Sequence, residues 1–552
     1  MTVHLDNPAS TEWGNMSWGH IESKDLLDWT PASVSVALRP DQDYDIEGVF
    51  TGCWMPPQDT ESTTLSVAYS SVKFLPFHWS TPPYPRDAAG ISLATSIDGG
   101  QTWEKSSQNP ILKGEPADVN VTGYRDPYVS SYPALDKARG QTEPGLYALV
   151  SGGIEGVGPT TFLYDIEKDN QEKWTYLNPL VDLPLRFQPS KKWNGNYGVN
   201  WECTNIIDLH AASGSDTRHF LIIGAEGDVE KEHIKNCDRP ADAPKRTTRA
   251  QVWMSGDLVA ADQGTKFQYS HGGYLDHGPY YAANSFLDPV TGRRIVYGWI
   301  PEEDITLDAA REKGWNGALA LPRELSLLRI PRVTGALNSP LEDIAPFETK
   351  EEADGSVTVF TLGVKPIEEL SRLRESSRVT NSETVLSLPG PEQEADKRIF
   401  TATSNIWELE ATISIKPGCE VVGFHLRHNE DLSVRTTVSF SVTTETIIVD
   451  RASSTTKAKV NTCPDAGPFT LLTTQEPGSS PELERLQLRI FSDGDILEVY
   501  ANDRFALATM VYSDSYGEEV GGITAFAQGG EASAVFENAT LWDGLAPRLI
   551  QN

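Results

Sequence analysis

Short runs of β-branched and aromatic residues recur along this chain of 552 residues, and each run ends in a cluster of glycine, proline, aspartate or serine. This alternation of strand formers with turn formers limits the possible folds more than any other feature of the sequence. Clear examples are the runs at 65–69, 146–150, 220–223 and 295–299. Because apolar residues at helical spacing are scarce, we expect an all-β protein.

Two segments share a pattern that is typical of propeller blades. In residues 96–103, Asp98 and Gly99 are placed to close a tight turn, with Trp103 packing beneath it. A shorter echo occupies residues 23–29, where a polar turn again precedes a tryptophan. With so few echoes, unrelated hairpins remain an alternative.

A change of pattern after residue 335 predicts two domains, as the length of the chain also suggests. We predict a first domain at 1–335, a linker at 336–350 and a second domain at 351–552. A short helix is expected at 366–375, where apolar residues are spaced three apart. In the second domain, apolar and polar residues alternate, as in 486–490. This alternation favours antiparallel strands with one solvated face, as in a β-sandwich. These strands are expected at 407–415, 421–426, 437–449, 486–491, 505–511 and 523–526.

The acidic composition restricts the partners. With 78 acidic and 46 basic residues, the formal net charge is −32, so nucleic acid and anionic membrane surfaces would be repelled, whereas a neutral sugar would not. No run of about 18 apolar residues predicts a membrane-spanning helix. Residues 1–10 lack the apolar core of a secretory signal. An extracellular location is favoured if a segment precedes Met1 and a cytoplasmic one otherwise, and the oligomeric state stays open.

The cysteines are few and widely spaced. There are five of them, an odd number, and no CxxC pair or Cys/His cluster is present. We therefore expect neither a zinc site nor a disulfide framework. No motif for another metal or an organic cofactor is present, so no cofactor is predicted.

Two acidic residues are distinguished by their neighbours: Asp126 follows Arg125, and Glu202 follows Trp201. Cleavage of a glycosidic bond uses one protonated and one ionised carboxyl group. Arg125 would keep Asp126 ionised, while Trp201 would partly desolvate Glu202 and raise its pKa. Taken singly, an acid in such a setting is far more often a solvated or salt-bridged surface residue than a catalytic one.

The chain resembles glycoside hydrolase family 32, the invertase, inulinase and fructosyltransferase family, over essentially its whole length. Seven or more motifs in family order are highly specific, whereas a single RDP motif would carry no weight. The matching stretches are WGNMSWGH at 13–20, GVFTG at 48–52, YRDP at 124–127, WEC at 201–203, LDHG at 275–278, YAA at 281–283, YGW at 297–299, GWNG at 314–317 and LPREL at 321–325. Residues 72–79 and 497–502 are similar to the fungal branch, which includes fructosyltransferases.

The resemblance implies a five-bladed β-propeller, with its first blade incomplete at the N-terminus, followed by a C-terminal β-sandwich. It also implies a retaining mechanism in which β-D-fructosyl groups of sucrose or short fructans are released or transferred. Carried over by motif, Glu202 is the acid/base, Asp126 the transition-state stabiliser, and Arg125 a ligand for fructose hydroxyls.

Four further residues, Trp13, Phe50, Asp276 and Trp299, match positions that line the family's substrate pocket. Packing in the core is the alternative for each of them, because aromatic residues in propellers are usually buried. Asp276 has the better case for binding, because a buried acid needs a partner and a sugar hydroxyl would serve.

The nucleophile of the family lies in a motif of the Asn-Asp-Pro-Asn-Gly type, which we expect one strand before Trp13 and therefore upstream of Met1. The Asp6-Asn7-Pro8 segment resembles it, but its spacing to Trp13 matches instead the Asn-Pro loop that follows the first inner strand. A mis-assigned start, a fragment and an inactive sugar-binding homologue are the open explanations. The first is favoured because the other motifs are intact.

Overall fold

Antiparallel β-sheets account for most of the regular structure. The computed structural model describes the backbone of residues 2–5 and then residues 14–31, 36–57, 62–212, 215–262, 264–353, 355–382, 386–389, 395–530 and 533–546. Three short α-helices lie in loops of the first domain: α1 (Pro133–Ala138), α2 (Glu232–Lys235) and α3 (Leu307–Lys313). Within these described ranges, no helix is long and apolar enough to span a membrane.

Four antiparallel sheets follow one another along the first part of the chain, and their strands pair in sequence order. The first contains β1 (Thr2–Leu5), β2 (Ser17–Ser23) and β3 (Trp29–Pro31). The second contains β4 (Gly48–Trp54), β5 (Leu65–Val72), β6 (Ala89–Ser96) and β7 (Glu104–Lys105). The third contains β8 (Val121–Ser130), β9 (Leu146–Ile154), β10 (Gly158–Ile166) and β11 (Trp174–Pro179). The fourth contains β12 (Asn200–His210), β13 (Thr217–Glu226), β14 (Arg249–Ala261) and β15 (Gly264–Tyr274).

A fifth sheet begins in the same way and takes in more strands. It contains β16 (Tyr281–Leu287), β17 (Arg294–Ile300), β18 (Ala318–Leu319), β19 (Arg323–Ala336), β20 (Glu348–Glu351) and β21 (Val357–Pro366). Because β21 pairs with β19 and β20 pairs with β21, this sheet extends beyond residue 335. The pairing favours a junction later than the predicted linker, near the 3-10 helix η2 (Glu368–Ser376). The domain boundaries stay a prediction.

The second domain is a sandwich of two antiparallel sheets that enclose one apolar core. One sheet contains β22 (Arg378–Asn381), β23 (Leu386–Leu388), β25 (Ile406–Ile415), β32 (Leu486–Asp493), β33 (Ile496–Ala501), β34 (Phe505–Met510) and β36 (Ala534–Asp543). The other contains β24 (Asp396–Thr401), β26 (Cys419–His428), β27 (Thr436–Ser441), β28 (Thr446–Asp450), β29 (Asp465–Pro468) and β35 (Gly522–Gly529). The predicted β-propeller followed by a β-sandwich is confirmed.

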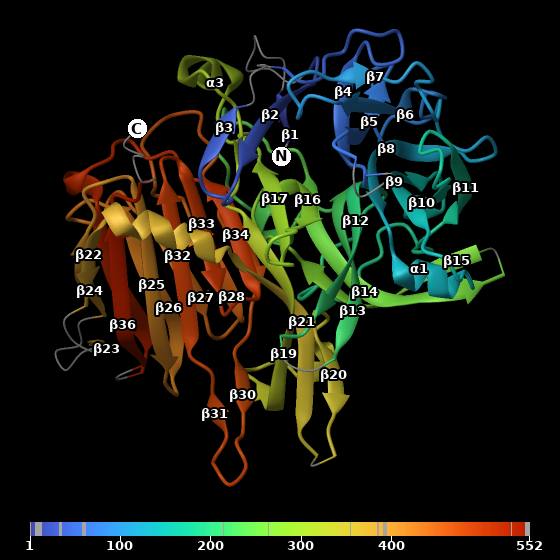
Figure 1. Ribbon diagram of the computed structural model, residues 1–552. Coiled ribbons are helices and arrows are strands. Elements are labelled where there is room, and N and C mark those ends of the chain that lie inside the picture. Colours follow the sequence, from blue (N-terminus) through green and yellow to red (C-terminus); the bar gives the residue numbers. More distant parts are fainter. Residues whose placement is uncertain are drawn as a thin grey trace.

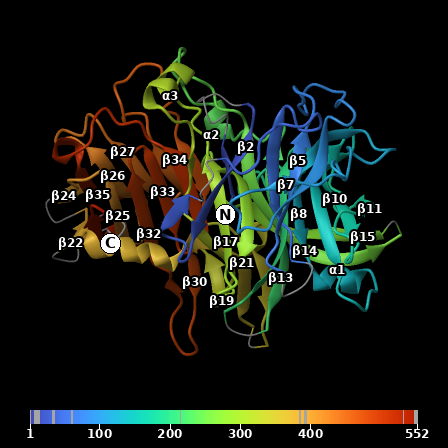
Figure 2. The same ribbon diagram turned by 45° about the horizontal axis from the view of Figure 1, so that its top comes forward.

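The two domains are joined by shared structure. Strands β30 (Leu472–Thr474) and β31 (Glu482–Leu483) lie in sequence between sandwich strands, yet β30 pairs with β19 of the fifth sheet. One apolar cluster also combines Phe360 of β21 with Tyr500 and Met510 of the sandwich. Figure 1 shows the sandwich strands on the left and the first domain on the right, and Figure 2 shows the same arrangement from a tilted view.

The turn expected at 96–103 forms between β6 and β7. The Gly100 amide donates to Oγ of Ser96 at 2.8 Å, and Nε1 of Trp103 donates to the Gly100 carbonyl oxygen at 3.2 Å. The echo at 23–29 closes the β2–β3 hairpin in a similar way. In both turns a short polar side chain accepts backbone amides, which explains why Asp and Ser stand there.

Two predicted elements of the second domain differ from the structure. The helix expected at 366–375 is the 3-10 helix η2, and Ile367 and Leu370 are buried as their spacing suggested. The single strand expected at 437–449 is a hairpin of β27 and β28. Its turn contains Glu445 in a left-handed conformation with φ of 52°, a turn that no glycine or proline announces.

The expectation of no disulfide is wrong. Cys237 follows α2 in the first domain, Cys463 precedes β29 in the sandwich, and the two form a disulfide across 226 residues of sequence. The other cysteines, Cys53, Cys203 and Cys419, are free. Spacing could not reveal the pair, because only the docking of the two domains brings its members together.

Candidate active site

The first strands of four sheets carry a β-bulge at corresponding places. The pairing register shifts between Val49 and Gly52 in β4, Arg125 and Pro127 in β8, Glu202 and Asn205 in β12, and Tyr281 and Asn284 in β16. In three of these bulges one residue adopts a positive φ, as Asp126 does at 61°. A bulge leaves its extra residue unpaired and redirects the side chains around it. The candidate residues of the YRDP, WEC and YAA motifs lie at these bulges.

Arg125 and Glu202 form the centre of the site. Nε and Nη2 of Arg125 donate to the same Oε1 of Glu202 at 2.7 and 2.5 Å. The other carboxylate oxygen of Glu202 accepts a hydrogen bond from the Tyr281 hydroxyl at 2.7 Å. The Glu202 side chain is 18% exposed, so it is buried enough to be oriented and open enough to meet a ligand.

Asp126 lies behind this pair and is held by the neighbouring strands. Its amide donates to Oγ of Ser70 at 2.7 Å, and its Oδ2 accepts the Cys203 amide at 3.2 Å. Only 4% of Asp126 is exposed. Burial, and after it the negative charge of Glu202, raises the pKa of Asp126 to about 7.

A third carboxylate, Glu226, belongs to the same cluster. Nη2 of Arg125 lies 3.3 Å from its Oε2, which also accepts from the side-chain amide of Asn200 at 3.2 Å. Burial, followed by the charge of Glu202, raises the pKa of Glu226 to about 7. Sequence reasoning missed this residue, which stands three residues after the apolar run 220–223 and belongs to none of the family motifs.

The net pKa shifts expected for the two carboxyl groups are wrong. Burial disfavours ionised Glu202, but the charge of Arg125, its hydrogen bonds and the hydrogen bond from Tyr281 together outweigh burial and hold the pKa of Glu202 below its ordinary value. Trp201 is fully buried and its Nε1 donates to the Tyr197 carbonyl oxygen, while Arg125 binds Glu202 and leaves Asp126 with a raised pKa. Arg125 still favours the ionised form of Asp126, but burial and the charge of Glu202 together outweigh it.

Aromatic side chains and a second arginine border the cluster. The Arg125 guanidinium lies 5.4 Å from the Phe77 ring centroid, and the Phe77 ring lies 6.4 Å from that of Phe50. Arg249 lies 5.5 Å from the Tyr281 ring and 5.6 Å from the Trp299 ring. Phe50 and Trp299 are thus placed beside the charged cluster.

Asp276 is not placed with these residues. Its side chain is fully buried where the domains meet, 2.8 Å from Nη1 of Arg323, and it accepts the backbone amides of Gly278 and Ala508. Burial raises the pKa of Asp276, with Arg323 opposing the shift. The partner that its burial demands comes from the protein and not from a sugar. Trp13 and Asp6 lie outside the described residues.

The arrangement brings three carboxyl groups and two guanidinium groups together under aromatic rings. Such a cluster can hold a proton near neutral pH and exchange it between neighbouring acids. Among the described residues, no group of three or more His, Cys, Asp or Glu side chains is arranged to hold a metal ion.

Family comparisons cover most of the chain. The model of the glycosyl hydrolases family 32 N-terminal domain matches residues 2–335, and that of the glycosyl hydrolases family 32 C-terminal domain matches residues 369–543. Among curated relatives, an acid beta-fructofuranosidase of Solanum lycopersicum is 29% identical over 367 residues, 65% of this chain and 49% of that protein. A fructan 6-exohydrolase of Beta vulgaris is 27% identical over 317 residues, 56% of this chain and 45% of that protein. The chain thus spans about half the length of the curated relatives it matches.

Solved structures extend the likeness over nearly the whole chain. A beta-fructofuranosidase of Aspergillus kawachii complexed with glycerol is 27% identical, with a TM-score of 0.83 over 99% of this chain and 92% of that one. A fructosyltransferase of A. japonicus has the same fold, with a TM-score of 0.83, 24% identity and coverage of 100% and 93%.

Proposed function

Because the chain belongs to glycosyl hydrolase family 32, we propose that it is a glycosidase of the β-fructofuranosidase type, which releases or transfers β-D-fructosyl groups. Sucrose and short fructans are the proposed substrates. The observation that supports the proposal is the partly exposed Glu202 carboxylate, which accepts hydrogen bonds from Arg125 and lies beside the buried Asp126. An acid that can give a proton, next to a carboxylate that can stabilise positive charge, supplies two of the three carboxyl groups that the proposed mechanism uses.

In the proposed mechanism Glu202 protonates the oxygen of the departing sugar. Asp126, ionised at that moment, stabilises the positive charge that develops on the fructosyl ring. The negative charge of Glu202 raises the pKa of Asp126, so protonation of Glu202 favours ionisation of Asp126. When Glu202 is protonated, Asp126 loses the repulsion that keeps it neutral.

Arg125 links sugar binding to the position of this proton. Its charge favours the ionised form of Glu202. Sugar hydroxyls that accept hydrogen bonds from the guanidinium would weaken its grip on Glu202 and favour movement of the proton onto that residue. Phe50, Phe77 and Trp299 supply apolar faces on which a sugar ring can rest.

A carboxylate nucleophile completes the retaining mechanism. We propose that it belongs to the motif expected upstream of Trp13. A chain without a nucleophile would retain the sugar pocket but lose most of the rate, because the glycosyl-enzyme intermediate could not form. A sugar-binding homologue that lacks activity is therefore the alternative.

One assay separates the two proposals. The 552-residue chain is incubated with sucrose, released glucose is measured, and sucrose binding is followed by titration calorimetry. Glucose release supports the glycosidase, whereas binding without release supports the sugar-binding homologue. If an extended chain that restores an Asn-Asp-Pro motif also stays inactive, the glycosidase proposal is wrong.

Glu202→Gln tests the acid/base assignment in any active form. We expect kcat to fall by about 10²–10⁴-fold while sucrose still binds, because the amide cannot supply the proton. Glu420→Gln, at an exposed position of the sandwich, is the matched control and should keep full activity. An unchanged rate in Glu202→Gln would refute the assignment.

A further inference from the structure

A cleft of about 460 Å³ lies between the first domain and the sandwich, next to the candidate active site. The segment between β13 and β14 supplies much of its wall, from Val229 to Arg249. Cys463 and Asp465 of the sandwich lie on the same cleft. Arg249 connects the two places, because it lines the cleft and also lies over the Tyr281 and Trp299 rings.

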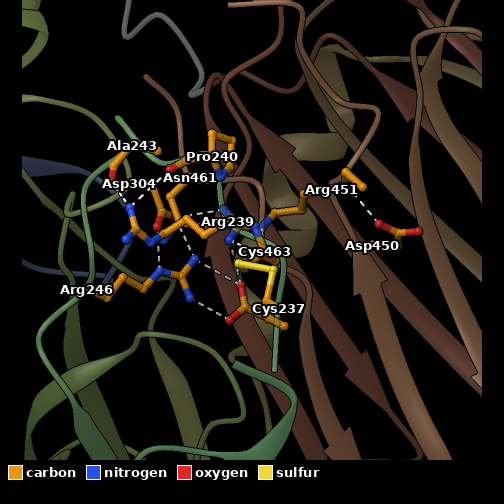
Figure 3. Close-up of a disulfide and its surroundings, with 12 residues drawn as sticks. Cys237, Arg239, Pro240, Ala243, Arg246, Asp304, Asp450, Arg451, Asn461 and Cys463 are labelled. Carbon is orange, nitrogen blue, oxygen red and sulfur yellow. Dashed lines mark hydrogen bonds and ion pairs between the residues drawn. A yellow bond between two sulfur atoms is a disulfide. The ribbon is translucent and has the colours of Figure 1, made fainter. Parts of the chain in front are cut away.

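The wall segment is fastened to the sandwich by a covalent bond and by ion pairs. Cys237 in the middle of the segment is bonded to Cys463. Arg246 lies nine residues further on, and it donates to Asp304 at 2.7 Å and to Asp465 at 2.6 Å. Figure 3 shows Arg246 and Asp304 beside the disulfide.

A second arginine completes the fastening from the sandwich side. Nη1 of Arg451 donates to the same Asp304 at 2.7 Å, and its Nε donates to the Cys463 carbonyl oxygen at 3.0 Å. The side chains of Arg451 and Asp304 are 1% and 3% exposed. Buried ion pairs with several hydrogen bonds hold one geometry, because breaking either partner leaves an unpaired buried charge.

Further contacts connect these ion pairs to the candidate active site. Glu303, the neighbour of Asp304, accepts the Thr247 amide at 2.9 Å and Nη1 of Arg249 at 3.1 Å. Arg249 is also paired in register with Glu226, and its charge favours the ionised form of Glu202. A shift of the wall segment would therefore move a cation that faces the carboxylate cluster.

We propose that the Cys237–Cys463 disulfide and the Arg246 ion pairs form a redox-sensitive latch that positions Arg249 beside Glu202 and so sets the affinity of the site for sugars. The effect on sugar affinity rests on the proposed function, whereas the latch itself does not. Opening requires a dithiol reductant. The S–S bond breaks, each sulfur gains one electron and one proton, and the dithiol closes to its own disulfide.

Peptide mapping of the intact chain tests the bond. Alkylation before reduction should leave Cys237 and Cys463 unmodified in one linked peptide pair, while Cys53, Cys203 and Cys419 are alkylated after unfolding. An alkylated Cys237 would overturn the latch.

Hydrogen exchange tests whether the bond restrains the wall. Dithiothreitol, and separately the Cys237→Ser/Cys463→Ser variant, should speed amide exchange at 231–248 by at least about tenfold, with β9 and β10 unchanged. Cys419→Ser, which removes a free thiol of the sandwich, should exchange like the wild type. Equal exchange at 231–248 in oxidised and reduced protein would overturn the proposal.

Sugar titrations test the link to Arg249. In the double variant and in reduced wild type, we expect KM and the sucrose Kd to rise by about three- to tenfold with kcat changed less than about twofold. Arg246→Ala should raise KM and Kd to a similar extent, and Arg246→Lys should recover part of the affinity. Arg485→Ala, which removes an exposed ion pair, is the control and should leave both constants unchanged. Faster exchange with unchanged affinity would overturn the positioning role. A wild type that neither binds nor cleaves sucrose would contradict the proposed function, and the exchange comparison would still decide on the latch.

Discussion

The guanidinium of Arg125 is bound to Glu202, 77 residues further along the chain, and not to Asp126, its neighbour in sequence. This pairing across two sheets gives the two carboxyl groups opposite tendencies. Glu202 is held ionised, while Asp126 tends to stay protonated toward neutral pH. The roles proposed for them in bond cleavage require the reverse distribution, so the proposed mechanism needs Glu202 to gain a proton and Asp126 to lose one when a sugar binds.

Arg125→Lys should show how much depends on the forked guanidinium. A lysine keeps the charge but cannot reach Glu202 and Glu226 together, so we expect kcat/KM for sucrose to fall by about 10–100-fold with little loss of stability. Arg139→Lys, at a partly exposed ion pair away from the site, is the control. If Arg125→Lys preserved kcat/KM, the positive charge alone would account for the role of Arg125, and the forked geometry of the guanidinium would not be needed.

Asp126→Asn should stabilise the protein at high pH. A carboxyl group whose folded-state pKa is raised keeps its proton after the unfolded chain has released one, so its contribution to folding stability falls as pH rises from about 4 to about 7. The neutral amide avoids this loss. We expect a gain of about 1–3 kcal/mol at pH 8 and almost none at pH 4, measured by thermal unfolding. Exposed Asp169→Asn should show no such dependence, and a variant less stable than wild type at pH 8 would contradict the assignment.

Asp276→Asn should weaken the contact between the domains and leave the sugar site intact. Its carboxylate balances Arg323 inside the protein, and removal of one partner of a buried ion pair costs about 3–5 kcal/mol. Urea unfolding should show this loss, and titration calorimetry should show unchanged sucrose affinity. Exposed Asp308→Asn is the control. Weaker binding without loss of stability would restore the substrate-binding role first expected from the sequence.

Ser96→Ala should loosen the turn between β6 and β7. Oγ of Ser96 accepts the buried Gly100 amide, and a lost hydrogen bond of this kind costs about 1 kcal/mol. A lower urea midpoint with unchanged sugar binding is expected. Ser131→Ala, at an exposed position before α1, should have no effect, and an unaltered midpoint in Ser96→Ala would show that the turn does not depend on this bond.

Local signals in the sequence identified the fold well, because a strand and its turns are encoded by adjacent residues. The apolar run at 220–223 lies within β13, and the turn at 96–103 forms as expected. The hairpin of β27 and β28 was not predicted, because its turn is stabilised by contacts with residues that are distant in sequence. The buried carboxylate of Glu445 binds Lys192, Asn338 and Thr470, each of which lies at least 25 residues away in sequence.

The candidate site was harder to predict, because its contacts join different sheets. The family motifs predicted a site that contains Arg125, Asp126 and Glu202. Sequence reasoning expected Arg125 to act on Asp126, whereas its guanidinium binds Glu202. Glu226 and Arg249 contribute to the cluster from β13 and β14, and no local pattern relates them to the motif residues. The disulfide escaped for the same reason, since only the folded interface brings Cys237 and Cys463 together.

Because β30 pairs with β19, the folding of the two domains is interdependent. A gene segment that encoded residues up to the end of β21 would yield a fifth sheet with an open edge, and its apolar partner surface would face water. The sandwich expressed alone would present a hairpin with nothing to pair with. Each half therefore covers an edge and an apolar surface of the other, and we expect neither to fold stably when it is expressed alone.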